Sequence, residues 1–196
     1  MIVSVAMALA ATAPSFDCAR ASTKVEQIIC TDELLRQSDR AVDLAYRKAK
    51  SRNVKAVVAA QKQWLMDRDA CSNLACVADR YDGRLFELLT VSGLGRDYGA
   101  GGGSLTVLPL GNGWFAFSAF RTYSRPSFGF PSQMVMTDAS ASGVFRLIGG
   151  KGERMPQAEY DTGWRLTKIR GGWRVECLPD LTACGGINAT IDGEYR

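Results

Sequence analysis

Three stretches of the chain carry apolar or small residues at a helical spacing. Between residues 33 and 90 these positions recur every three or four residues, which places them on one face of a helix rather than on alternate faces of a strand. They are Leu35, Ser38, Val42, Ala45 and Ala49; then Val54, Val57, Val58, Trp64 and Leu65; then Leu74, Val77, Tyr81, Leu85 and Leu88. A short polar break at residues 51–53 predicts that the first two helices fold back antiparallel.

The sequence also indicates where two helices begin. Thr23 followed three residues later by Glu26 is a capping box, which predicts a short helix just before the first long one. Asp32 and Glu33 then place acidic side chains at the start of the next helix, where the helix dipole favours negative charge. Arg68 and Asp69 on the second long helix, facing Asp39 and Tyr46 on the first, predict a buried polar cluster that fixes the register of the helices; a binding role is the alternative.

Four of the six cysteines lie at the two ends of this helical region. In a hairpin with equal arms, Cys30 and Cys71 meet at the open end, which predicts a nested pairing of Cys30–Cys71 inside Cys18–Cys76. The two other connectivities of four cysteines stay open. A metal site is the weaker alternative, because neither pair has the C-x2-C spacing of zinc ligands and the chain contains no histidine.

The helical region resembles the LprI-type lysozyme-inhibitor family over roughly residues 17–89. The residues that carry the resemblance are Cys18, Ala21, Glu26, Cys30, Leu34 or Leu35, Asp39, Tyr46, Gln61, Trp64, Leu65, Arg68, Asp69, Cys71, Cys76, Tyr81, Arg84 and Leu88. The resemblance implies a cysteine-rich helical domain of the bacterial envelope. It also implies that the protein inhibits a lysozyme-type muramidase.

A glycine-rich segment follows the helices. Residues 91–103 include Gly99 and Gly101–Gly103, and we predict a linker there. A phosphate-binding loop is excluded, because such a loop follows a strand and precedes a helix, whereas here a helix precedes and an apolar, strand-like run follows.

Beyond the linker, short apolar runs alternate with turn signals, as in an antiparallel β-domain. The predicted strands are Ser104–Leu108, Trp114–Thr122, Gln133–Thr137, Val144–Ile148, Gly163–Ile169, Gly172–Cys177 and Ile187–Tyr195. Tight turns are expected at residues 111–113 and 170–172, and a local disulfide at Cys177–Cys184. The predicted fold class is therefore α+β: a disulfide-stapled helical hairpin or bundle (17–90), then a small antiparallel barrel or sandwich (104–196).

The start of the chain predicts export. Met1–Ala13 is apolar and then rich in alanine, and Ala8-Leu9-Ala10 forms a cleavage site of the signal-peptide type; a buried N-terminal strand is the alternative. This segment is too short to span a bilayer, and Ser15-Phe16-Asp17 before Cys18 does not form a lipoprotein box. Together with an even number of cysteines, this predicts a periplasmic or secreted protein without a membrane anchor.

The amino-acid composition excludes several classes of function. The chain is 46% hydrophobic and 22% charged, with a net charge of +4, a mild bias that does not indicate nucleic-acid binding. Without histidine there is no Ser-His-Asp or Cys-His machinery, and a carboxylate pair of the glycosidase type is the one catalytic alternative left. We therefore predict a non-catalytic protein without cofactor or metal. The alternatives to muramidase inhibition are an envelope module for peptidoglycan, anionic lipid or a protein, and an immunity protein against one toxin.

Two groups of residues combine features of contact surfaces. Cations with aromatic neighbours, typical of interface hot spots, occur in two hairpin loops, and we predict that one of them enters the acidic cleft of a muramidase; ordinary hairpin loops are the alternative. These residues are Arg121, Tyr123, Arg125, Phe128, Lys168 and Arg170. A second group of cations surrounds the predicted helical turn and would suit an anionic surface, or would simply be a solvated helix end. These residues are Arg47, Lys48, Lys50, Arg52 and Lys55.

Overall fold

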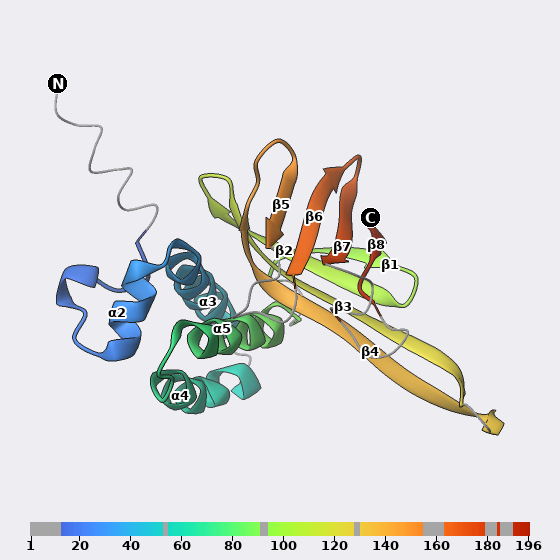
Figure 1. Ribbon diagram of the computed structural model, residues 1–196, viewed down its shortest axis with the longest axis horizontal. Helices are drawn as coiled ribbons and strands as arrows, with labels where there is room; N and C mark the ends of the chain where they lie inside the picture. The colour runs from blue at the N-terminus through green and yellow to red at the C-terminus, as the bar shows by residue number, and fades with distance from the viewer. Residues whose placement is uncertain are drawn as a thin grey trace. The chain divides into compact units, whose positions relative to one another are not determined.

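The computed structural model describes residues 13–52, 55–90, 94–127, 130–154, 163–178, 184 and 190–196. A short 3-10 helix, η1 (Cys18–Arg20), precedes four α-helices (Figure 1). These are α2 (Lys24–Thr31), α3 (Glu33–Ser51), α4 (Lys55–Asp69) and α5 (Leu74–Leu89). The predicted signal peptide, with its cleavage site, lies almost entirely outside the described residues.

The helices begin where the sequence indicates. Thr23 caps α2 in a complete capping box with Glu26, and the side chain of Asp32 accepts a hydrogen bond from the amide of Leu35 at the start of α3. The polar break predicted at residues 51–53 falls where α3 ends, at Ser51, and before α4 begins, at Lys55. Helix α5 packs against both α3 and α4, and α2 packs against α3 and α5. The buried faces of these four helices form the helical core. Its largest side chains are Ile29, Leu35, Trp64, Tyr81, Leu85, Leu88 and Leu89.

Eight strands follow in the described part of the chain, arranged in two four-stranded antiparallel sheets (Figure 1). The first sheet has the order β1-β2-β3-β4 and the second the order β5-β6-β7-β8. The strands are β1 (Arg96–Ala100), β2 (Gly103–Gly111), β3 (Trp114–Ser127), β4 (Phe130–Arg146), β5 (Lys151–Arg154), β6 (Gly163–Ile169), β7 (Gly172–Leu178) and β8 (Gly193–Tyr195). Neither sheet closes into a barrel, so the α+β prediction is confirmed in its sandwich-like form.

Several strands differ from the prediction. The predicted strand Gln133–Thr137 and the first three residues of the predicted strand Val144–Ile148 are parts of the single long strand β4. Strand β5 was not predicted, and the last predicted strand is reduced to β8, with residues 187–189 outside the described ones. The turn at residues 111–113 is as predicted: Asn112 and Gly113 both have positive φ, at 51° and 77°, as a two-residue hairpin of the primed type requires.

The glycine-rich segment is not a linker from Arg96 onward. Residues 96–100 form β1, which pairs with β2. On its other side, Gly99 exchanges two backbone hydrogen bonds of 3.0 Å with Arg196, next to β8. Backbone groups alone make these bonds, so a segment with few strand-favouring side chains can still be a strand.

The chain forms two compact units, and the boundary between them differs from the one predicted at residues 91–103. One contains the helices and the residues up to Arg96, with residues 107–117 and 142–145; the other contains residues 97–106, 118–141 and 146–196. Within the first unit, the Ser142 hydroxyl of β4 donates a 2.6 Å hydrogen bond to the carbonyl of Asp82 in α5. The helices therefore share their unit with parts of β2, β3 and β4.

The nested disulfide pairing is wrong. The structure joins Cys18 to Cys30 and Cys71 to Cys76, with Cα–Cα distances of 5.7 and 5.6 Å. Each pair brackets a turn of the chain, between η1 and α2 or between α4 and α5, and the turn brings its two cysteines together. A disulfide needs its two Cα atoms roughly 4.4–6.8 Å apart. Facing helices pack with their axes about 8–10 Å apart, so cysteines on two such helices reach this separation less readily. The third pair is Cys177–Cys184, so all six cysteines are bonded.

Candidate functional site

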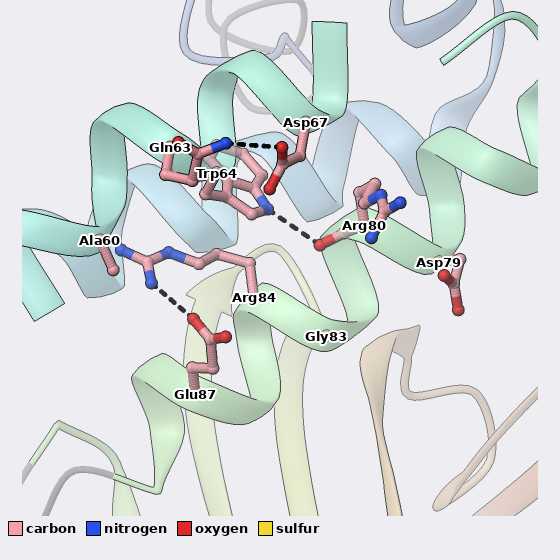
Figure 2. Close-up of a pocket in the computed structure, with 9 residues that line it drawn as sticks. All are labelled: Ala60, Gln63, Trp64, Asp67, Asp79, Arg80, Gly83, Arg84 and Glu87. Atoms are coloured by element: carbon pink, nitrogen blue, oxygen red, sulfur yellow. Dashed lines mark hydrogen bonds and ion pairs between the residues drawn. The ribbon is translucent and has the colours of Figure 1, made fainter. Parts of the chain in front are cut away.

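An open groove runs between α4 and α5, within the segment that resembles the inhibitor family. It has a volume of about 310 Å³ and is shown in Figure 2. Four of its residues come from α4 and five from α5, at spacings of one, three or four that keep each set on one helix face. The lining residues are Ala60, Gln63, Trp64 and Asp67, and Asp79, Arg80, Gly83, Arg84 and Glu87.

Arg84 fixes the two walls of the groove to one another. Its side chain is 1% exposed, and it ion-pairs with Glu87 at 2.6 Å. Its Nη2 donates to the carbonyl oxygen of Val57 and to Oε1 of Gln61, both at 2.8 Å. Because the guanidinium is buried, these three partners satisfy a charge that would otherwise be costly to bury, and they join α5 to α4.

Trp64 lies between α4 and α5 at the base of the groove (Figure 2). Its indole Nε1 donates to the carbonyl oxygen of Arg80 at 3.0 Å, and its ring packs edge-on against Tyr81 with the centroids 5.4 Å apart. Only 9% of Trp64 is exposed. It is a core residue that closes the groove, in agreement with its place on the apolar stripe.

A polar cluster lies beside Trp64. It contains Asp39, Arg68 and Asp69, as the sequence predicts, but its tyrosine is Tyr81 and not the predicted Tyr46. The Tyr81 hydroxyl donates to Oδ1 of Asp39 at 2.7 Å and accepts from Nη1 of Arg68 at 3.2 Å. Arg68 also ion-pairs with Asp69 at 2.7 Å. Burial, reinforced by the Asp39 carboxylate, raises the pKa of Tyr81 well above its usual range. The phenol therefore stays protonated as the donor to Asp39, and the cluster locks the register of α3, α4 and α5.

The charges that face solvent around the groove are mainly negative. Asp67, Asp79 and Glu87 are exposed, and so is the single cation Arg80. The Asp67 carboxylate accepts a 2.9 Å hydrogen bond from the side-chain amide of Gln63 (Figure 2). Sequence reasoning missed this groove, although Gly83, a glycine inside an amphipathic helix, is a signal that something other than helix propensity selects the residue.

The contact residues predicted in the first β-hairpin loop have partners inside their own unit. Nη1 of Arg121 donates to the carbonyl oxygen of Asp192 at 2.6 Å, and the Tyr123 hydroxyl donates to the carbonyl oxygen of Thr190. These bonds hold the segment that leads into β8. The side chain of Arg125 and the residue Phe128 lie outside the described part of the structure.

The second predicted loop is exposed. Lys168 places its Nζ 4.2 Å from the centroid of the Trp173 ring and 5.6 Å from that of Tyr98, and Arg170 is exposed at the turn between β6 and β7. Nothing in the structure shows a partner for this turn, and its role as a contact stays a prediction.

The cations around the turn between α3 and α4 are all exposed: Arg47, Lys48, Lys50, Arg52 and Lys55. Among them, Arg47 and Lys48 make the following contacts within their unit. Arg47 ion-pairs with Asp43 at 2.5 Å, and Nζ of Lys48 donates to the carbonyl oxygen of Leu94 at 3.2 Å.

The described residues contain neither a candidate metal centre nor a candidate membrane span. No group of three or more Asp, Glu, Cys or His side chains in that part of the chain is placed to hold a metal ion. In the same part, every helix is too short or too polar to cross a membrane.

Comparison with known proteins places the likeness in the helical segment. Residues 17–93 match the family model described as lysozyme inhibitor LprI. The proteins named Lipoprotein LprI from Mycobacterium bovis and Mycobacterium tuberculosis are each 38% identical to this chain over 79 residues. That match covers 38% of this chain and 40% of each relative.

The relatives thus share with this chain less than half of their length, and no solved structure matches the chain significantly. The matched residues include both N-terminal disulfides and both walls of the groove. The resemblance of residues 17–89 to the LprI lysozyme-inhibitor family is therefore confirmed for the four-cysteine helical segment of this chain.

Proposed function

We propose that this protein is an exported, non-catalytic inhibitor of lysozyme-type muramidases and that its helical segment makes the inhibitory contact. The observation that carries the proposal is the match of residues 17–93 to the LprI lysozyme-inhibitor model. Three disulfides support an oxidising compartment, and the names of the relatives support an envelope location.

The position of the match bears on which surface makes the contact. Arg121 and Tyr123 lie outside the matched residues and hold the C-terminal segment through hydrogen bonds. The groove between α4 and α5 lies inside the match and faces solvent. We therefore place the primary contact on the helices and keep Arg125 and Arg170 as secondary candidates, whose cations would pair with the two carboxylates of a lysozyme cleft.

The test is a lysis assay with the full mature chain against muramidases of the c, g and i types and bacterial toxin lysozymes. We expect the rate of cell-wall lysis by at least one class to fall as the protein is added, and no lysis by the protein alone. A comparison of Arg170→Glu with a helical-surface variant locates the contact, because only a change within the true interface weakens inhibition. If every class retains its full rate at saturating protein, the proposed function is wrong.

The second candidate function is binding to an anionic envelope surface, and one observation favours it. The five cations around the α3–α4 turn are all exposed. Co-sedimentation with peptidoglycan or anionic vesicles would support this role if it weakens with salt and on neutralisation of Lys50 and Lys55, which have no part in holding the fold in the described contacts.

A further inference from the structure

The groove between α4 and α5 has the shape and charge of a site for a long cationic side chain. Of the charged residues that line it, Asp67, Asp79 and Glu87 are exposed carboxylates, and Arg80 is the exposed cation. The charge of Glu87 is paired with that of Arg84, so Asp67 and Asp79 are the carboxylates that would meet an incoming cation. Arg84 does not reach solvent, because its side chain is 1% exposed. Its contribution is to hold the Glu87 carboxylate in place at 2.6 Å. The open face of the groove is therefore negative, although the chain as a whole is positive.

Part of the lining of the groove is apolar. Ala60 and Gly83 line it together with the edge of Trp64. A Cβ built at Gly83 would meet no atom within 4 Å, so the missing side chain leaves the α5 wall open. The volume of about 310 Å³ lies at the lower end of the roughly 300–1,000 Å³ of ligand pockets. Apolar lining residues beside exposed carboxylates match an aliphatic stem that ends in a positive group.

Other occupants fit less well. Trp64 is only 9% exposed and presents no open ring face on which a sugar could stack. An anionic group would meet three carboxylates and a single exposed guanidinium. Of the residues in the structure's described ranges, no set is arranged to hold a metal ion.

We propose that this groove receives a lysine or arginine side chain from the surface of the partner muramidase. The proposal rests on the proposed function and adds the part of the partner that is recognised. It also removes an electrostatic difficulty, because a chain with a net charge of +4 would otherwise repel a basic enzyme. A local acidic groove gives such an enzyme one orientation in which opposite charges meet.

The first test measures the affinity for the muramidase that the wild-type protein inhibits. Asp67→Asn and Asp79→Asn should each weaken binding by about fivefold, the upper range for an exposed ion pair. Glu87 is left unchanged because its removal would leave the buried Arg84 without its ion-pair partner. Glu33→Gln, an exposed acidic position on α3 outside the groove, is the matched control and should bind as the wild type does.

A steric variant tests the groove without changing charge. Gly83→Met fills the open wall and should weaken binding by at least tenfold. Ala59→Met adds the same side chain at an exposed position of α4 that does not line the groove, and should leave binding unchanged. Circular dichroism of both variants checks that α5 still forms.

The outcomes separate the two proposals. If the wild type inhibits a muramidase and the groove variants bind like their controls, the groove proposal is overturned and the proposed function stands. If no muramidase binds, the function fails, and the groove is then tested alone by NMR with a triarginine peptide and with its citrulline counterpart. Shifts at groove residues with arginine but not with citrulline support the cation site, and the same response to both peptides, or to neither, rejects it.

Discussion

The hydroxyl of Tyr81 is the centre of the helical core, and its removal gives the sharpest test of how the core is held. Tyr81 is 0% exposed. Its hydroxyl donates to Asp39 at 2.7 Å and accepts from Arg68 at 3.2 Å, so Tyr81→Phe deletes two hydrogen bonds to charged groups while it keeps the ring against Trp64. A hydrogen bond to a charged group is worth about 1.5–3 kcal/mol.

The two bonds do not contribute equally. The longer bond to Arg68 is the weaker, and that guanidinium keeps its 2.7 Å ion pair with Asp69. Asp39 retains the amide of Ser15 at 2.6 Å and the guanidinium of Arg68 at 3.8 Å. We therefore expect Tyr81→Phe to lower the free energy of unfolding by about 3 kcal/mol, near the value of one strong charged hydrogen bond together with a weak one.

Urea unfolding followed by the helical circular dichroism signal measures this loss, with the disulfides intact in both proteins. Tyr46→Phe is the matched control, since Tyr46 is a half-buried tyrosine of α3 outside the cluster, and we expect it to cost less than about 0.5 kcal/mol. A loss below 1 kcal/mol for Tyr81→Phe, or an equal loss in both variants, would show that packing and not the polar cluster holds the three helices together.

The remaining predictions concern connectivity, pH and activity. Peptide mapping of the unreduced protein should recover Cys18 bonded to Cys30 and Cys71 bonded to Cys76; a peptide that joins Cys30 to Cys71 would contradict the structure. Burial raises the pKa of Tyr195 from its ordinary 10.0 to about 12. Its contribution to stability is therefore complete below pH 10 and is lost as the pH rises towards 12, so Tyr195→Phe should show a flatter alkaline decline in unfolding free energy. We also predict that the protein slows lysis by a muramidase and that the groove variants weaken binding to it; the expected results are given with the two proposals.

The helical half could be read from the sequence because its signals are local. The spacing of Val42, Ala45 and Ala49 sets the buried face of α3, and the capping box at Thr23 sets the start of α2. Those helix phases also predicted that Arg68 and Asp69 face Asp39, but not that Tyr81, rather than Tyr46, joins them. Disulfide connectivity did not follow from them, because nested and sequential pairings both suit the same cysteine spacing. The turns that decide between them are set by a few backbone angles around η1 and before α5.

Strand β1 and the groove were missed for a common reason: each depends on partners that are distant in the sequence or on an absent side chain. Gly99 is a strand residue because Arg196 offers it backbone hydrogen bonds. The groove exists because two helix faces meet and because Gly83 has no side chain. The spacing of apolar residues predicts neither feature, because it indicates which side chains are buried and not where a space is left between helices.

The sequential order of the disulfides has a consequence for biosynthesis. The six cysteines form three consecutive pairs along the chain: the first is bonded to the second, the third to the fourth and the fifth to the sixth. A chain that is threaded through a membrane from its N-terminus therefore presents each thiol together with its native partner, and an oxidase that joins thiols in order of emergence produces the native set without rearrangement. The nested pattern would have left Cys18 and Cys30 waiting for the rest of the helical segment, with Cys18–Cys30 as a trap to be undone by an isomerase. This protein should accordingly mature at a normal rate in a cell that lacks disulfide isomerase but retains the oxidase.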